Sequence, residues 1–207
     1  MTMTLREIVD DFAKCIKLVD ARSPRAVSTR TKRPFRPGIG PHSETQVVEL
    51  VTAEMMERFP TRHAGKISIN VPYPDMPRQR CDFCVGSDER WEWAVEVKML
   101  RILGDNGKPN DNILMHILSP YPKHRSAVTD CKKLSGSRLG NRKAVLIYGY
   151  EAEDYPLALA IKAFETIASS CVELSPRVAA EFKGLIHPVH RDGMVYGWEI
   201  APRGAAI

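Results

Sequence analysis

The sequence predicts a single α/β domain in which a mixed central β-sheet is flanked by helices. Its length of 207 residues suits one domain of this kind. Hydrophobic residues make up 43% and charged residues 27%, a composition typical of globular proteins with a buried core. Helix-like and strand-like hydrophobic periods alternate along the chain, and this alternation favours a sheet that is covered by helices on both faces.

Two helices are expected ahead of the first strand. Residues 4–19 carry apolar side chains at helical spacing, and residues 43–59 repeat the pattern with Ser43 as the expected N-cap. Between them, residues 22–41 hold six Lys or Arg and no acid among prolines and glycines, which indicates a basic arm. We therefore expect an N-terminal helix and basic arm over residues 1–41, and the main domain over residues 42–207.

The main domain is expected to begin with an antiparallel meander, to which a strand–helix–strand crossover adds a parallel strand. A Pro-rich turn over residues 73–79 separates the first two strands, and a Gly-Ser-Asp-Glu turn joins the next two. A loop with a short helix or strand at residues 113–118 follows the meander. The expected strands are residues 66–71, 81–85, 91–100, 143–150, 184–190 and 195–200, and the expected helices are residues 125–139 and 156–170.

The distribution of charge favours a polyanionic partner. The chain has a net charge of +5 and a pI of about 9.0. Besides the six basic residues of the arm, seven more stand against a single acid between residues 123 and 143. Such clusters are typical of nucleic-acid-binding proteins, although a plain enzyme also fits so small a net charge.

Features of exported and membrane proteins are missing from the sequence. No run of residues approaches 18 apolar positions, and acids occupy the N-terminal stretch where a signal peptide would be apolar. Five cysteines are an odd number in a chain of this size, which fits reduced thiols better than a disulfide framework. We therefore expect a cytoplasmic protein.

The strongest chemical signal is the segment Val95–Lys98, with the sequence VEVK. Glu96 and Lys98 share one face of the expected strand, because residues two apart lie on the same side about 6.5 Å from each other. A structural ion pair or a solvated edge strand would also explain this pair. However, Asp82 on the preceding strand can come to lie beside Glu96. Two carboxylates at that distance could bind Mg²⁺, which prefers oxygen ligands.

The second helix adds a further acid. Its apolar stripe runs through Val48, Val51 and Met55, and continuing the stripe back by four residues reaches Glu44 at the start of the helix. The carboxylate is thus in line with the buried side of the helix.

Asp82, thirteen intervening residues, and Glu96-Val97-Lys98 resemble the signature of the PD-(D/E)XK nucleases. The resemblance extends over about 110 residues, because the expected elements follow the restriction-endonuclease-like αβββαβ core. It implies a Mg²⁺- or Mn²⁺-dependent DNA endonuclease, in which Asp82 and Glu96 bind the metal and Lys98 positions or activates water. Many members carry an acid on the first core helix, which implies that Glu44 completes the ligand set.

The chain departs from this signature at one position. Cys81 stands where the family name would place proline, whereas a literal Pro-Asp pair occurs at Pro74-Asp75. Asp75 is therefore an alternative metal ligand, although its neighbouring prolines disfavour a paired central strand.

The resemblance also implies a partner, namely double-stranded DNA, and no membrane. The chain would act alone, as a homodimer or as a subunit of a larger nuclease, in restriction or DNA processing. An inactive DNA-binding or assembly module and a different hydrolase are the alternatives. The expected phosphate contacts are Lys132, Lys133, Arg138 and Arg142 after the catalytic strand, with Arg33 and Arg36 in the arm.

Other candidates carry weaker signals. Cys81-x-x-Cys84 resembles half of a zinc site, but positions three apart on a strand face opposite sides, which favours structural cysteines. His42, His116 and His124 are either surface residues or contacts to phosphate.

Overall fold

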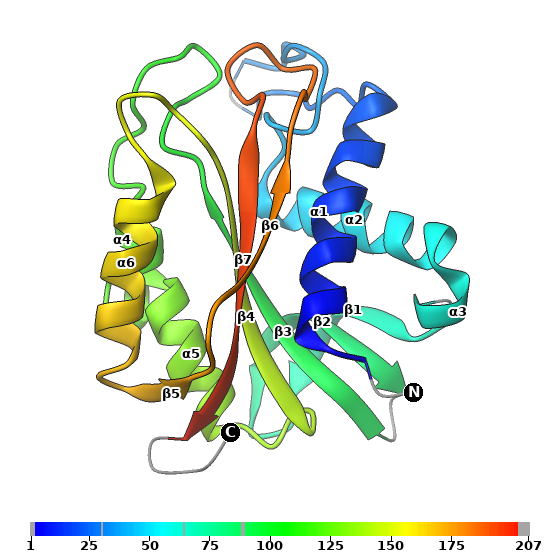
Figure 1. Ribbon diagram of the computed structural model, residues 1–207, viewed down its shortest axis with the longest axis vertical. Coiled ribbons are helices and arrows are strands. Elements are labelled where there is room, and N and C mark those ends of the chain that lie inside the picture. The colour runs from blue at the N-terminus through cyan, green and yellow to red at the C-terminus, as the bar shows by residue number, and fades with distance from the viewer. Residues whose placement is uncertain (1–2, 30, 64, 88–89, 203–207) are drawn as a thin grey trace.

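A seven-stranded mixed sheet forms the centre of the protein and carries helices on both faces, which confirms the predicted fold class (Figure 1). The computed structural model describes residues 3–29, 31–63, 65–87 and 90–202. The strand order is β1-β2-β3-β4-β7-β5, with β6 paired to β7. The strands are β1 (Ile67–Tyr73), β2 (Met76–Ser87), β3 (Arg90–Leu100), β4 (Arg142–Tyr150), β5 (Val172–Leu174), β6 (Val178–Phe182) and β7 (Gly193–Pro202).

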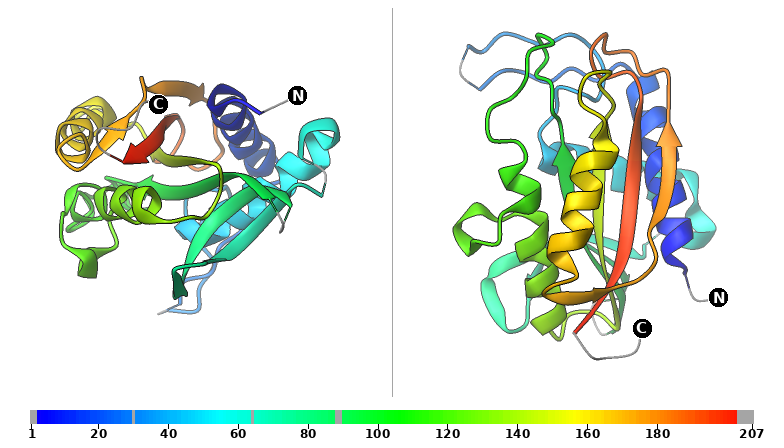
Figure 2. Two further views of the ribbon diagram at one scale, coloured as in Figure 1. Left: turned by 90° about the horizontal axis from the view of Figure 1, so that it is seen from below. Right: turned by 60° about the vertical axis from the view of Figure 1, so that its left-hand side comes forward.

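The helices divide between the two faces of the sheet (Figures 1 and 2). One apolar core lies between the sheet and the helices α1 and α2, and a second core lies between the opposite face and α4, α5 and α6. The helices are α1 (Leu5–Ala21), α2 (Glu44–Arg58), α3 (Pro60–His63), α4 (Met115–Leu118), α5 (Ala127–Gly136) and α6 (Leu157–Ala168), with a 3-10 turn at Pro122–His124.

Both N-terminal helices begin with a capping box. The Thr4 side chain accepts from the backbone N–H of Glu7, whose own side chain returns to the cap, and Ser43 and Gln46 repeat the arrangement in α2. Ser43 is therefore the N-cap, as predicted, and it fixes the point at which Glu44 enters the helix. Helix α2 ends at Arg58, ahead of Pro60.

The strands β1, β2 and β3 form the predicted antiparallel meander, but β2 is longer than expected. The Pro-rich turn shortens to two residues, because Tyr73 already pairs with Met76. Proline cannot donate to a ladder, and Pro77 is tolerated in β2 because the register shifts between Pro72 and Tyr73 on the partner strand. In the turn between β2 and β3, Asp88 and Glu89 lie outside the described residues, as does Arg30 of the arm.

The predicted crossover is present, with α5 lying between the parallel strands β3 and β4. Alternate residues of β4 enter the two apolar cores, which explains why its sequence is almost uniformly apolar. Because of this crossover, α5 lies over the face of β3 that carries Glu96 and Lys98.

The prediction was wrong in the C-terminal part. Residues 184–190 form a loop and not a strand, because Gly184 adopts a left-handed φ of +73° and Pro188 lacks a backbone donor. The short strands β5 and β6 lie upstream instead, and both pair with β7. Helix α5 also begins later than predicted, after Arg125, whose φ is +47°.

Of the helices within the described ranges, none combines the length and apolar character that crossing a bilayer requires. All five cysteines are free thiols, and four of them are buried.

Candidate functional site

The site forms where β2 and β3 separate. Their ladder ends at the pair Phe83–Val95, so the backbone N–H groups of Val97 and Met99 have no backbone carbonyl partner on β2. Carboxylates take over this role: Asp82 Oδ2 accepts from Val97 N at 2.7 Å, and Glu44 Oε2 accepts from Met99 N at 2.7 Å. The open edge of β3 therefore fixes two acids in place.

Asp82 and Glu96 face each other across this opening. Extending the register by one residue places them opposite each other, and both side chains line the same cleft. Lys98 lies on the same side of β3 as Glu96, and its Nζ is 3.3 Å from Glu44 Oε1. The structure thus brings together all four residues for which the sequence suggested a catalytic role.

These residues line a cleft of about 1320 Å³ between β2, β3, α5 and the loop that precedes α5. The cleft is lined by Glu44, Met76, Arg78, Gln79, Arg80, Asp82, Glu96, Lys98, Met99, Ile113, His116, Pro122, Lys123, His124, Arg125, Thr129, Asp130, Lys132 and Lys133.

Helix α5 supplies an acid that the sequence analysis missed. Asp130 is buried, with its two oxygens 2.8 Å from Lys98 Nζ and 2.8 Å from Lys133 Nζ. Asp130 was counted only as the single acid of a basic segment, because the direction of its side chain depends on how α5 crosses β3. Lys133 was expected to contact phosphate, and it instead lies against the inner wall of the site.

Glu96 is enclosed by donors at the floor of the cleft. The Tyr73 hydroxyl donates to Glu96 Oε1 at 2.5 Å, and Lys133 Nζ lies 2.8 Å from the same oxygen. Tyr73 is also buried, and the Lys133 ammonium lies 5.1 Å from the centre of its ring. Because both donors engage one oxygen, the second oxygen of Glu96 is not held by them.

The site carries more negative than positive charge. Four carboxylates, those of Glu44, Asp82, Glu96 and Asp130, face the two ammonium groups of Lys98 and Lys133, so two formal negative charges are in surplus. Burial raises the pKa of the carboxyl groups of Asp82 and Glu44, and it raises the pKa of Glu96 well above its usual range. A divalent cation has the charge that would offset this surplus.

Lys98 remains charged despite its burial. Desolvation alone would lower its pKa, but the carboxylates of Asp130, Glu44 and Asp82 outweigh that effect and raise the pKa above its usual value. The amine is therefore held as an ammonium donor and is poorly suited to accept a proton.

The mouth of the cleft is basic. Its exposed cations are Arg78, Arg80, Lys123, Arg125 and Lys132, contributed by β2, α5 and the segment ahead of α5. Of the predicted phosphate contacts, Lys132 alone lies on this rim. The other four cations were not predicted as phosphate contacts. Arg78 was assigned to a turn, and the placement of Arg80, Lys123 and Arg125 at the cleft depends on the tertiary fold.

The remaining predicted phosphate contacts lie outside the cleft lining. Arg138 forms a short ion pair with Asp75, with Nη2 2.6 Å from Oδ1, and lines a separate surface hollow. Arg142 pairs with Glu199 at 2.6 Å and stacks over Trp93. Arg33 and Arg36 are exposed on the arm, away from the residues that line the cleft.

The alternative ligand Asp75 is not in the cleft either. It lies in the turn between β1 and β2, where the Arg138 guanidinium lowers the pKa of its carboxyl group. His116 and His124 both line the cleft, and His124 Nδ1 is 2.6 Å from the Ser119 hydroxyl. Cys81 and Cys84 are buried free thiols, as expected, but both pack in the same apolar core, so the prediction that they face opposite sides was wrong.

Comparisons of the chain with protein-family models, curated proteins and solved structures find no match.

Proposed function

We propose that this protein is a metal-dependent DNA endonuclease of the PD-(D/E)XK type. One observation carries the proposal: the carboxyl groups of Asp82 and Glu96 converge, with Lys98 beside them, at the floor of a cleft whose rim is basic. Acids in such surroundings repel one another and repel phosphate, unless a cation joins them.

The donor set fits Mg²⁺ or Mn²⁺. The ligand atoms would be carboxylate oxygens of Asp82 and Glu96. Glu44 lines the same cleft but does not converge with these two acids into a three-ligand group, so its part in the set follows from the family resemblance. Two formal negative charges in surplus match one divalent ion. When bound, such an ion acts as a Lewis acid toward a phosphoryl oxygen and makes water more acidic.

Lys98 supplies a fixed positive charge. Asp130 and Glu44 hold its ammonium group from two sides, so it reaches into the cleft without having to reorganise. A charge placed in this way stabilises the negative charge that develops on a phosphoryl oxygen during hydrolysis. The raised pKa of Lys98 supports this role, and the positioning of water, over the role of a general base.

The rim favours a nucleic acid as substrate. Five exposed cations surround the mouth of the cleft, whereas the acids lie at its floor. Phosphates of a backbone would contact the rim and one phosphodiester would reach the floor. A double-stranded DNA substrate, and a role in restriction or DNA processing, follow from the family resemblance.

The proposal is tested by plasmid nicking with Mg²⁺ and with Mn²⁺. We expect wild type to nick, and Asp82→Asn, Glu96→Gln and Lys98→Met to lose at least about 100-fold in rate while still binding DNA. In Asp82→Asn the side-chain oxygen can still accept from Val97 N, and in Glu96→Gln it can still accept from the Tyr73 hydroxyl. We therefore expect both amide variants to keep the fold. Asp75→Asn is the matched control, since Asp75 is an acid outside the cleft, and it should nick like wild type.

Two outcomes would contradict the proposal. If wild type binds DNA and never cuts it with either ion, the protein is a binding or assembly module. If it fails to bind DNA even at low salt, where phosphate contacts are strongest, the substrate is not a nucleic acid.

A further inference from the structure

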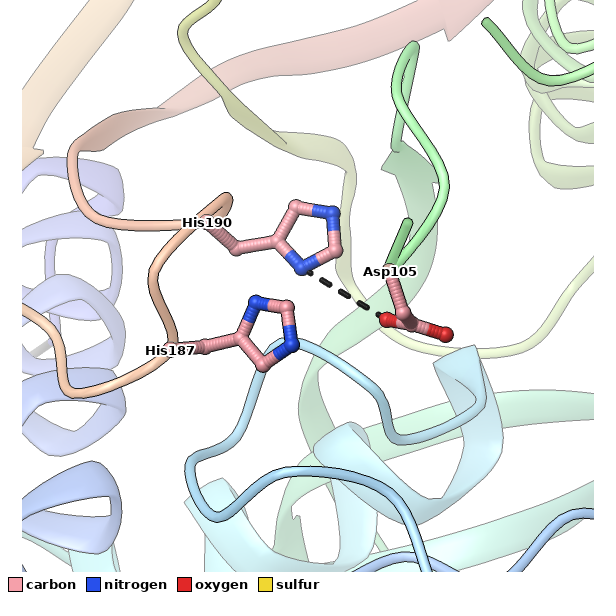
Figure 3. Close-up of side chains that lie close together, drawn as sticks. All are labelled: Asp105, His187 and His190. Carbon is pink, nitrogen blue, oxygen red and sulfur yellow. Dashed lines mark ion pairs between the residues drawn. The ribbon is translucent and has the colours of Figure 1, made fainter. Parts of the chain in front are cut away.

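A second polar cluster lies away from the cleft, at one end of the sheet. Figure 3 shows the imidazoles of His187 and His190, from the loop between β6 and β7, turned toward Asp105 in the loop after β3. One nitrogen of each ring and one carboxylate oxygen lie within 4.8 Å of one another. Both rings are buried, at 1% exposure each.

The three converging atoms have no hydrogen-bond partners. Asp105 Oδ1, His187 Nε2 and His190 Nδ1 are all buried, and each is unpaired among the described residues. A buried polar atom without a partner costs about 1–3 kcal/mol, so three such atoms facing one another require an explanation. The nearby guanidinium of Arg101 does not supply one: its Nη1 is 3.9 Å from Asp105 Oδ1 and donates to Gly40 O at 2.7 Å.

The hydrogen bond made by His190 determines which of its ring nitrogens carries the proton. Its Nε2 lies 3.0 Å from the carbonyl oxygen of Leu103, which can only accept, so Nε2 carries the proton. The lone pair of Nδ1 then points toward a carboxylate oxygen 3.7 Å away.

We propose that Asp105, His187 and His190 form a binding site for a divalent transition-metal ion of the zinc class. Two imidazoles and a carboxylate are ligands that Zn²⁺ accepts, with water in the fourth position. The carbonyl of Leu103 orients His190 from behind, as the hydrogen-bond partners of metal-bound histidines do. If His187 coordinates through Nε2, its proton moves to Nδ1, which can then no longer accept from Val189 N. The contact that is lost is weak, with a donor–acceptor distance of 3.4 Å.

The spacing favours a tetrahedral ion. With ligand bonds of about 2.1 Å, neighbouring ligand atoms are about 3.4 Å apart around a tetrahedral centre and about 3.0 Å apart around an octahedral one. The separation of 3.7 Å between His190 Nδ1 and Asp105 Oδ1 is nearer the tetrahedral value. Nitrogen ligands and this geometry separate the site from the all-oxygen set of the cleft, which suits Mg²⁺.

The site would join three segments that meet at this end of the molecule. His187 and His190 belong to the loop between β6 and β7, Asp105 to the loop after β3, and the end of the basic arm packs against both histidines. In Figure 1 these loops lie together at the top of the sheet. A bound ion would therefore stabilise the arrangement of the loops.

The test uses Co²⁺ as the probe, with the full chain stripped of metal and with Mg²⁺ in excess to saturate oxygen sites. We expect one Co²⁺ per chain with the intense visible absorption of tetrahedral Co²⁺, which Zn²⁺ abolishes by competition. Asp105→Asn and His190→Gln should each weaken Co²⁺ binding at least about 100-fold. His116→Gln, at an exposed histidine in the cleft, should bind like wild type.

Two results would overturn the proposal. One is the absence of a tetrahedral Co²⁺ spectrum in wild type, which would assign the three unpaired atoms to a buried water molecule. The other is a spectrum that survives in both Asp105→Asn and His190→Gln. Asp105→Asn changes one atom of a partly exposed side chain, so we expect this variant to fold. Thermal melting in the absence of metal shows whether each variant is folded.

Discussion

The cleft and the histidine cluster treat buried polar groups in opposite ways. In the cleft, Lys98 and Lys133 lie within ion-pair distance of the acids, so much of the negative charge is offset by the chain itself. In the cluster, one polar atom each of Asp105, His187 and His190 converges on the others, and none of the three has a hydrogen-bond partner among the described residues. We therefore expect the cleft to persist without metal and the cluster to be stabilised by an occupant.

The largest effect, on the free energy of unfolding, is expected from Lys133→Met. This variant would remove one of the two ammonium groups that offset the negative charge of the cleft. Glu96 and Asp130 would each lose a cation at 2.8 Å, and an uncompensated buried charge costs about 3–5 kcal/mol. Urea unfolding at neutral pH measures this loss of stability.

The neighbouring lysine provides the control for that variant. Lys132→Met, on the exposed side of the same helix, should change stability by less than about 0.5 kcal/mol. Combining Lys133→Met with Glu96→Gln should recover part of the loss, because the buried charge is removed together with its partner. Equal stability of Lys133→Met and wild type would show that the ion pairs contribute nothing.

A smaller effect is expected at the histidine cluster from Gly40→Ala. A Cβ at Gly40 would lie 2.6 Å from His190 Nδ1, so the ring must shift. We expect a loss of about 1–3 kcal/mol in stability and weaker Co²⁺ binding, with plasmid nicking unchanged. Gly136→Ala is the control, since a Cβ there meets no atom within 4 Å, and it should be neutral or stabilising by up to about 1 kcal/mol. Unchanged Co²⁺ binding in Gly40→Ala would count against a site at His190.

The smallest effect concerns the rim of the cleft. Replacing Arg78 and Lys123 together by alanine should reduce the slope of log affinity against log salt by about 0.9 for each lost phosphate contact. DNA affinity should fall several-fold, while the rate at saturating DNA is kept. Arg138→Ala removes an equally exposed cation outside the cleft and should leave the slope unchanged. A reduced slope for Arg138→Ala alone would place the DNA on another surface.

The sequence was informative where a local period determines position. Two-residue alternation places Glu96 and Lys98 on one side of β3, and the short connection to β2 places Asp82 across from them. Asp130 could not be found in this way, because its contact with Lys98 depends on the path of α5 across the sheet. The histidine cluster lies in two loops without any period, and His187 and His190 fell within a segment that was wrongly predicted as a strand.

The separation of β2 from β3 has one further consequence, which concerns how this protein could change over generations. Asp82 fills a gap in a ladder, and asparagine would fill that gap equally well through its carbonyl oxygen. A single conservative substitution, Asp82→Asn, would therefore remove the proposed catalytic activity while the fold and the basic rim are preserved. Under the proposed function, cutting and binding would be separable properties, and a lineage could lose the first while retaining the second.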